Sequence, residues 1–397
     1  MTKSSTALVI GCGIAGPAAA VALQKAGISS VVYEQHPGSA PEAGSFLTLA
    51  TNGVDALRTL DADKAATSVG FQTTGIVLWS GTGKRLGTAE VSMTLPDGTT
   101  GYTMKRGDLY SALRATAELH GIRVEGTKQL VGVTEVGAGV RADFSDGSRA
   151  DADILVGCDG AYSTVRGAID SNAPAPKYAG LVNLGGFVRG VPVDAAPGTY
   201  HMIFGKQAFF GFAVAPDGEV WWFANVPQAT EPERGSLALI SGDVWRQQLR
   251  ELFADDAGPA VPLIEATSHE LRANAVHTLG HLPRWHTDRM VVMGDAAHAP
   301  SPSSGQGASL AIEDAVELAK DLRDLPGPAE AFAAFERARR PRVERVIKQA
   351  ARVNNSKAAT GAGRALRDAM LPVVLKLVAN TKHSRQLYGH HIDWDRG

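Results

Sequence analysis

The feature that most limits how this chain can fold is a glycine-rich turn near its N-terminus. An apolar run, residues 7–10, leads into Gly11-Cys12-Gly13-Ile14-Ala15-Gly16, and an Ala-rich segment follows to residue 26. Gly11 permits the turn, Gly13 lets the backbone approach a pyrophosphate, and Gly16 lets the helix pack against the strand. The helix N-terminus then directs free backbone N–H groups at the phosphates. The motif predicts a dinucleotide site within an α/β fold.

A second apolar run, residues 30–33, ends on Glu34. A carboxylate at the end of this predicted strand is placed to accept hydrogen bonds from an adenosine ribose. Because Glu34 is acidic and Gln35 is not basic, a free 2′-hydroxyl fits better than a 2′-phosphate. A purely structural turn is the less favoured interpretation, since strand, helix, second strand and acid arrive in order. FAD and NAD both satisfy this pattern.

The length and net charge of the chain limit the number of structural units and the kinds of binding partner that can be expected. A chain of 397 residues is long for one core, so two structural units are expected. The net charge of −2 gives no excess of positive charge that would indicate nucleic-acid binding, so small molecules are the expected partners. Because the predicted first strand begins at residue 7, no signal peptide is expected, and the longest apolar window, residues 369–379, is too short to span a bilayer. We expect a cytoplasmic protein without a transmembrane segment, as a monomer or homodimer.

The two cysteines, Cys12 and Cys158, each follow an apolar strand at a glycine-containing turn. Packing as small apolar side chains is favoured over a redox pair. The sequence contains no Cys/His spacing typical of zinc, so no metal site is predicted.

Two further turns follow buried-type strands. The first holds Asp159-Gly160, with Ser163 and Arg166 just beyond it. The second begins Gly294-Asp295 and continues through His298 to the prolines and glycines at residues 300–307, where a long helix starts. That helix start is another site suited to an anion. For His298, bonding to backbone groups of the turn is favoured over a catalytic proton role.

Residues 178–275 are rich in aromatic side chains on β-like runs. Alternation puts Phe210 and Phe212 on one face of a strand, while Trp222 opposes its two neighbours on the next. Any single ring is more readily explained as part of a hydrophobic core than as part of a binding site. Together, the aromatic side chains suggest a pocket for a planar apolar ligand. Tyr200, His201 and Arg189 lie in the same region, and alternation does not say which of them face the pocket.

The three separated motifs together resemble the FAD-dependent aromatic hydroxylase superfamily, the single-component monooxygenases that include para-hydroxybenzoate hydroxylase, over about residues 5–350. We therefore expect an α/β protein with a Rossmann-type FAD-binding domain, an inserted mixed β-sheet substrate domain and a C-terminal helix. The expected ranges are 1–75, 100–177 and 276–345 for the FAD domain, 76–99 and 178–275 for the substrate domain, and 346–397 for the helical segment.

The resemblance also implies residue roles. Asp295 would bind a ribityl hydroxyl, and Arg106 would lie beside the ribityl-pyrophosphate segment. Pro302 would line the reacting face of the flavin, and residues 44–47 would border the ring, with Phe46 where many relatives have glycine. Asp159 would help hold FAD and shape the route of the nicotinamide. The predicted cofactor-binding residues are Gly11, Gly13, Ile14, Ala15, Gly16, Glu34, Arg106, Asp159, Asp295, Pro302, Gly305, Gln306 and Gly307. The predicted pocket residues are Phe46, Phe187, Phe210, Phe212, Trp222 and Pro302.

The implied activity is that of a monooxygenase that uses FAD, takes NADH or NADPH as a transient co-substrate and consumes dioxygen. Dioxygen would add to the flavin C4a carbon, and the hydroperoxide would hydroxylate or epoxidise an apolar aromatic, polyketide-like or isoprenoid molecule. No catalytic side chain is predicted. The alternatives are an FAD-dependent reductase or dehydrogenase of a hydrophobic metabolite and a non-catalytic flavoprotein that sequesters a ligand.

Overall fold

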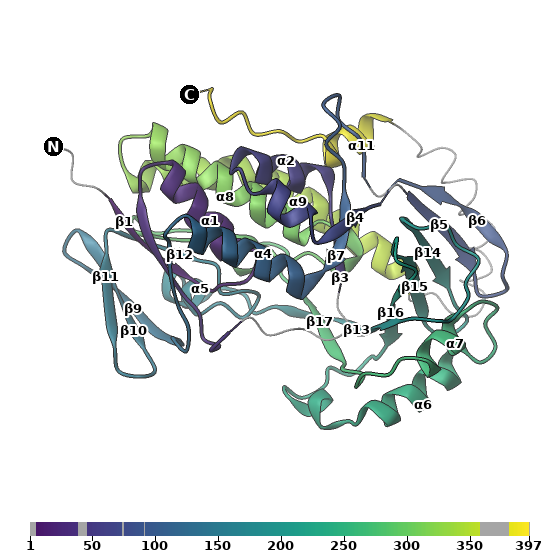
Figure 1. Cartoon of the computed structure of the whole chain (residues 1–397). Helices are drawn as coiled ribbons and strands as arrows, with labels where there is room; N and C mark the ends of the chain where they lie inside the picture. The colour runs from purple at the N-terminus through teal and green to yellow at the C-terminus, as the bar shows by residue number, and fades with distance from the viewer. Residues whose placement is uncertain (1–4, 39–45, 74, 91, 358–380, 397) are drawn as a thin grey trace.

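A five-stranded parallel sheet is the centre of the first structural unit of the computed structural model, which describes residues 5–38, 46–73, 75–90, 92–357 and 381–396 (Figure 1). Its strand order is β18-β12-β1-β2-β8. The strands are β18 (Met290–Val292), β12 (Ile154–Gly157), β1 (Thr6–Ile10), β2 (Ser29–Tyr33) and β8 (Arg123–Glu125). Residues 7–10 are all buried, as a strand covered on both faces requires, and this explains their continuous apolar run.

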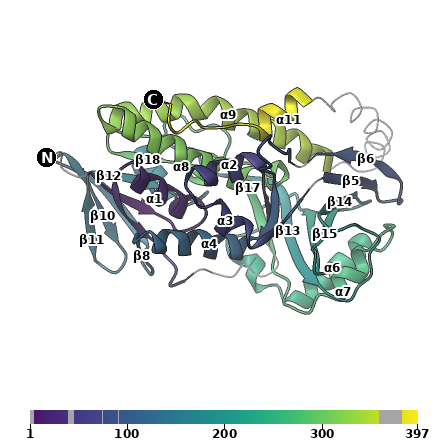
Figure 2. The ribbon, with the colours of Figure 1, turned by 45° about the horizontal axis from the view of Figure 1, so that its top comes forward.

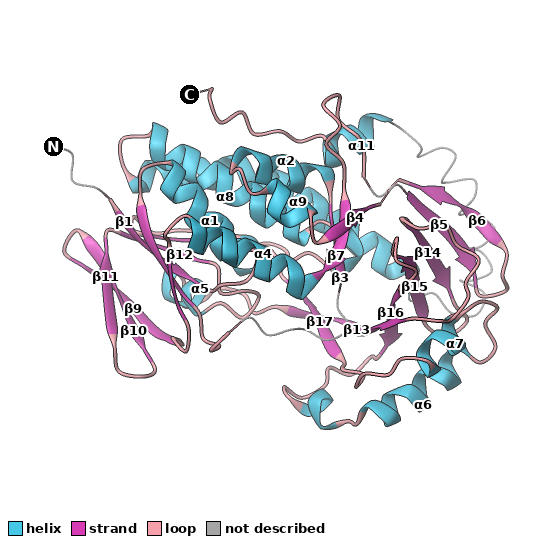
Figure 3. Ribbon diagram, in the orientation of Figure 1, coloured by secondary structure: helices cyan, strands magenta, loops and turns pink. Residues whose placement is uncertain are grey.

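Helices pack against this sheet and against one another (Figure 3). They are α1 (Ala15–Lys25), α2 (Thr51–Thr59), α3 (Asp63–Thr67), α4 (Arg106–Leu119), α5 (Thr164–Ile169), α8 (Gly307–Asp324) and α9 (Pro328–Lys357). Two small sheets complete the unit: β9 (Leu130–Val136), β10 (Gly139–Phe144) and β11 (Arg149–Ala152) form one, and β3 (Phe46–Leu49), β7 (Tyr102–Lys105) and β4 (Gly70–Gln72) form the other. Short 3₁₀ turns occur at η1 (Ser236–Leu239), η2 (Gly294–Ala296) and η3 (Pro302–Ser304).

The second unit is a seven-stranded mixed sheet, ordered β17-β13-β16-β15-β14-β5-β6. Its strands are β5 (Gly75–Ser80), β6 (Arg85–Ala89), β13 (Lys177–Val188), β14 (Thr199–Phe204), β15 (Phe209–Val214), β16 (Val220–Pro227) and β17 (Asn274–Thr278). β14 and β5 pair in parallel, whereas the other neighbours are antiparallel. The predicted fold class, a Rossmann-type unit with an inserted mixed sheet, is confirmed.

Helices α6 (Gly242–Phe253) and α7 (Ala260–Glu265) cover one face of this sheet (Figure 2). Strands β5 and β6 come from a segment far from the other five, so one sheet is built from two distant parts of the chain. The domain borders themselves stay predictions. β17 runs across the border expected at residue 275, and α9 runs unbroken across the one expected at 346.

The C-terminal residues return to the first unit. After α11 (Thr381–Tyr388), His391 Nδ1 lies 2.6 Å from Asp55 Oδ2, and Arg323 donates to the carbonyl of Trp394 at 2.8 Å. Residues 358–380, which include the apolar window noted above, lie outside the described residues. Within the described ranges, no helix combines the length and the apolar character needed to cross a membrane.

Candidate active site

The glycine turn after β1 is close-packed at two of its three glycines. Gly11 has a φ of +99°, and a Cβ there would lie 2.4 Å from the carbonyl oxygen of Cys158. A Cβ on Gly16 would lie 1.9 Å from the carbonyl oxygen of Gly11. These glycines are therefore required for the fold itself, because the turn is pressed against the end of β12 and against its own helix.

Gly13 is different, because a Cβ there would meet no close contact. The nearest atom to that position is Tyr110 Oη, 4.0 Å away. α1 starts beside it at Ala15, and its N-cap, Ile14, offers no side-chain cap to the first helical N–H groups. Room in front of Gly13 and uncapped N–H groups at one helix end fit a pyrophosphate.

This contrast gives a first prediction. Gly13→Ala is expected to fold with near-normal stability but to lose at least about tenfold in FAD affinity, because the methyl group fills the phosphate space. Gly16→Ala is expected to disturb the turn itself. Thermal unfolding of the FAD-free proteins, followed by FAD titration, checks both. Equal loss of stability in the two variants would show that Gly13 is also only a packing residue.

Glu34, directly after β2, folds back onto the glycine turn. Its Oε2 accepts the backbone N–H of Cys12 at 2.7 Å, and its Oε1 accepts that of His36 at 2.9 Å. The side chain is only half-buried, and each carboxylate oxygen has a second lone pair. The ribose contact stays a prediction, while the observed bonds show that Glu34 also holds the turn in shape.

Both cysteines are reduced and lie near this turn. Burial raises the pKa of the Cys12 thiol to about 11 and that of Cys158 well above its usual value. Since the thiolate is the reactive form, neither side chain is set up for redox chemistry at neutral pH. This supports the packing interpretation.

The Asp159 motif is held by its own helix start. Asp159 accepts the Ser163 hydroxyl at 2.5 Å and the backbone N–H groups of Thr164 and Val165 at 2.7 and 3.1 Å. Arg166 is buried and donates to the carbonyls of Ala296 and Ala161 at 2.9 and 2.7 Å. The arginine thereby ties this motif to the Gly294-Asp295 motif, 130 residues away in sequence. Contact of Asp159 with FAD stays a prediction.

Asp295 lies where the motifs meet. Its side chain is exposed, yet surrounding protein raises the pKa of its carboxyl group, an effect that the positive charge of Arg106 opposes. The Cβ position of Gly307, at the start of α8, is 3.9 Å from Asp295 Oδ1. Arg106 Nε donates to Tyr110 Oη at 2.7 Å, the same hydroxyl that borders Gly13. The fold therefore gathers the glycine turn, Arg106, Asp295 and the start of α8 in one place.

The segment after Asp295 combines accessible backbone with one buried side chain. Pro302 and Gly305 are exposed, whereas Gln306 is fully buried. The N–H groups of Gly305 and Gln306 already donate to the Pro302 carbonyl and to Ser304 Oγ, at 3.1 Å each. The resemblance implies that Gly305, Gln306 and Gly307 offer backbone N–H groups to a flavin, and donation from the first two would replace those bonds. Residues 44 and 45 of the predicted ring-bordering loop lie outside the described residues.

A buried ionic cluster behind this segment was not foreseen. Gln306 Oε1 accepts Asn52 Nδ2 at 3.0 Å, and Asn52 also donates to Glu313 at 2.6 Å. Arg339 pairs with Glu313 and Asp314 at 2.7 and 2.6 Å. The only signal in the sequence is two adjacent acids in an otherwise apolar stretch of α8.

The cluster also corrects the interpretation of His298. Its Nε2 lies 2.6 Å from Asp314 Oδ2, so the ring bonds to a buried carboxylate and not to backbone groups of the turn. Asp314 in turn accepts the backbone N–H of Gly294 at 2.9 Å. The histidine therefore supports the turn indirectly, through the side chain that holds it.

An aromatic wall forms where β3 meets the seven-stranded sheet. Phe46 lies with its ring centroid 5.7–6.3 Å from those of four rings on the sheet. These are Phe187, Tyr200, Trp221 and Phe223. The Tyr200 hydroxyl is within hydrogen-bond distance of Thr48 and Thr103 in the first unit. Two of the predicted pocket residues, Phe46 and Phe187, lie in this wall.

The other three rings of the predicted pocket lie on the opposite face of the sheet. Phe210, Phe212 and Trp222 are buried in the core formed with α6 and α7. Trp222 Nε1 donates to Thr267 Oγ1 at 3.0 Å, and the Phe210 ring contacts Phe253 of α6 at 5.4 Å. These three rings therefore fill a core on the face of the sheet opposite the aromatic wall, and their role in a substrate pocket stays a prediction. Both faces of the sheet are covered and aromatic, so alternation separated the two sets without showing which one faces the cofactor motifs.

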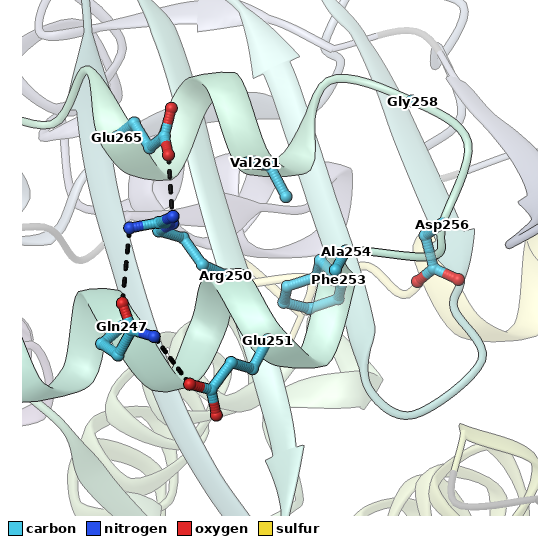
Figure 4. Close-up of a pocket in the computed structure, with 9 residues that line it drawn as sticks. All are labelled: Gln247, Arg250, Glu251, Phe253, Ala254, Asp256, Gly258, Val261 and Glu265. Atoms are coloured by element: carbon cyan, nitrogen blue, oxygen red, sulfur yellow. Dashed lines mark hydrogen bonds and ion pairs between the residues drawn. The ribbon is translucent and has the colours of Figure 1, made fainter.

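A surface hollow between α6 and α7 is remote from this wall, on the other side of the sheet (Figure 4). Four of its charged and polar side chains form two pairs: Arg250 with Glu265 at 3.1 Å and Gln247 with Glu251 at 2.6 Å. The hollow contains none of the predicted site residues.

The fold and the gathered motifs define a flavin-dependent oxygenase, and the comparisons agree. The family of FAD binding domains matches residues 4–350, so the chain belongs to that family. It is 31% identical to the aurachin C monooxygenase/isomerase of Stigmatella aurantiaca, over 87% of each chain. It is 30% identical to an FAD-dependent urate hydroxylase of Mycolicibacterium vanbaalenii, over 86% of each.

Among solved structures, Klebsiella pneumoniae HpxO in complex with FAD and uric acid is similar, with a TM-score of 0.83, 26% identity and coverage of 98% of this chain and 96% of that one. The resemblance to the FAD-dependent aromatic hydroxylase superfamily is confirmed, as are the enzyme class and the FAD cofactor. The individual site residues stay proposals.

Proposed function

We propose that this protein is a monooxygenase that consumes NADH or NADPH and uses FAD and dioxygen to hydroxylate or epoxidise an apolar aromatic or heteroaromatic small molecule. One observation carries the proposal. Phe46 of the aromatic wall pairs across β3 and β7 with Lys105, and the next residue, Arg106, belongs to the gathered cofactor motifs. The wall for a planar ligand therefore adjoins the place where a flavin would be held.

When bound, FAD would take a hydride from the nicotinamide and activate dioxygen, chemistry that no side chain can supply. The chain's own part is to bind and to shield. The turn at Gly13 and the start of α1 would receive the pyrophosphate, and Asp295 and Arg106 would orient the ribityl segment. The wall would stack on the substrate ring and exclude water.

The pocket that we propose is accordingly revised. Its residues are Phe46, Phe187, Trp221 and Phe223, with Pro302 kept from the original prediction. By their names, the two relatives reported above act on aurachin C and on urate. The rings lining this wall favour the more apolar kind of substrate. Cytoplasmic location and a monomeric or homodimeric state stay predictions from the sequence.

The test is turnover under ¹⁸O₂. The purified protein should carry FAD, and NADH and NADPH oxidation should be measured with a panel of alkylated hydroxyquinolines and naphthols. Oxygen-18 in the product is the expected result. Reduction or dehydrogenation without the label would favour a reductase, and tight binding without turnover would favour a sequestering protein. A protein that cannot be loaded with FAD would overturn the proposal.

A further inference from the structure

Lys105, the last residue of β7, brings a positive charge to the aromatic wall. Its ammonium nitrogen lies 4.3 Å from the ring centroid of Phe187 and 5.4 Å from that of Trp221. Its cross-strand partner is Phe46, so the lysine and this phenylalanine share one face of the small sheet. The charge therefore lies among the rings proposed to hold the substrate.

The charge is only partly neutralised. Lys105 Nζ lies 2.8 Å from Glu219 Oε2, and Trp221 Nε1 donates to the same oxygen at 2.8 Å. Arg189 approaches the other oxygen of Glu219 at 3.5 Å from the exposed side. An ammonium group has three N–H donors, and the Lys105 side chain is 33% exposed, so it can bind a second acceptor while it keeps Glu219.

We propose that Lys105 is a specificity-determining residue that binds an anionic oxygen of the substrate. The substrate class is then an apolar ring that bears an ionisable hydroxyl group. This inference rests on the proposed function, because it takes the wall as the substrate pocket. An apolar wall alone would disfavour a ring oxyanion through desolvation, and a neighbouring ammonium offsets that cost. The same ring would stack on Phe187 and Trp221.

The alternative is a purely structural role, in which the ion pair of Lys105 with Glu219 joins β7 to the turn before β16. The two roles predict opposite effects of Glu219→Gln on ligand binding. If Lys105 binds an oxyanion, Glu219→Gln removes its competing partner and should strengthen anion binding. If the pair has only a structural role, Glu219→Gln and Lys105→Met break the same contact and should weaken binding alike.

The experiment uses the FAD-loaded protein and two probes of similar shape. 4-Nitrophenol ionises with a change in absorbance, and 4-nitroanisole cannot ionise. Equilibrium dialysis gives the affinities, and absorbance against pH gives the apparent pKa of bound 4-nitrophenol. The wild type should lower that pKa. Lys105→Met should weaken 4-nitrophenol by at least about tenfold, the loss of a charge-assisted bond, and leave 4-nitroanisole unchanged.

Two further variants complete the design. Lys105→Arg should retain most of the anion preference, and Arg189→Gln, which removes an exposed cation from the same glutamate, should behave as wild type. FAD content and thermal unfolding are measured for each variant. Equal affinity of the wild type for both probes, or equal weakening of both probes by Lys105→Met, would overturn the inference. Binding needs no turnover, so failure of oxygen insertion with this pattern intact would contradict the proposed function alone.

Discussion

Replacing Arg339 by Met is expected to cost about 3–5 kcal/mol of folding free energy, because it leaves two buried carboxylates without their main counter-charge. Arg339 on α9 is 1% exposed and bonds both Glu313 and Asp314 of α8. Arg342 also pairs with Glu313, at 2.7 Å, whereas Arg339 bonds to Asp314. The expected loss therefore falls mainly on Asp314, and through it on His298 and Gly294.

The ionisation of the two carboxyl groups determines how the stability of the cluster depends on pH. Burial alone would raise the pKa of Glu313, but Arg339 and Arg342 hold it at about 2, and His298 and Arg339 hold that of Asp314 far below its usual range. A depressed carboxyl pKa contributes stability that is complete above the unfolded value and is lost as pH falls through the folded value. In the wild type, the Glu313 contribution should decline from about pH 4.5 towards pH 2.

Urea unfolding at pH 7 and pH 4 measures both effects. The deficit of Arg339→Met should be larger at pH 7, because acid protonates the carboxylates that the variant leaves unpaired. Arg141→Met is the matched control, since its partner Asp151 is 61% exposed and a surface pair of this kind contributes little to stability. A deficit for Arg339→Met no larger than that of the control would show that the cluster is stabilised by other means.

Trp222→Ala is expected to cost about 3–5 kcal/mol of stability, because it empties a large core position under α6 and leaves Thr267 without its indole partner. Trp222 has no exposed surface, and its ring stacks on Phe210 at 5.5 Å. The FAD content of the folded fraction should be unchanged, since the cofactor motifs lie in the other unit. Urea unfolding and flavin absorbance measure the two quantities.

Phe223→Ala, one residue along β16, is the matched control because it faces Phe46. It should cost less stability, since the side chain is only half-buried, and should weaken binding of 4-nitroanisole. The opposite pattern, with Trp222→Ala stable but impaired in ligand binding, would restore the original assignment of Trp222 to the pocket.

Local chemistry accounts for what could be predicted. Gly11 and Gly16 are recognisable because a turn between strand and helix tolerates no Cβ there, and Glu34 because it ends the next strand. The order of these signals along the chain was enough to predict the Rossmann unit and its dinucleotide. The inserted mixed sheet followed from the resemblance that the three motifs carry together.

The sequence by itself thus determined the elements, the cofactor class and the two faces of each strand. Only the tertiary structure decided which face of the sheet meets the cofactor motifs, because a period of two places Trp221 and Trp222 on opposite faces of one strand without showing what each face contacts. It also decided that Asp314 pairs with Arg339, 25 residues away on another helix. Such pairs arise from how helices pack. From sequence alone, a charged residue is expected to lie at the solvent-exposed surface, because charged side chains are seldom buried.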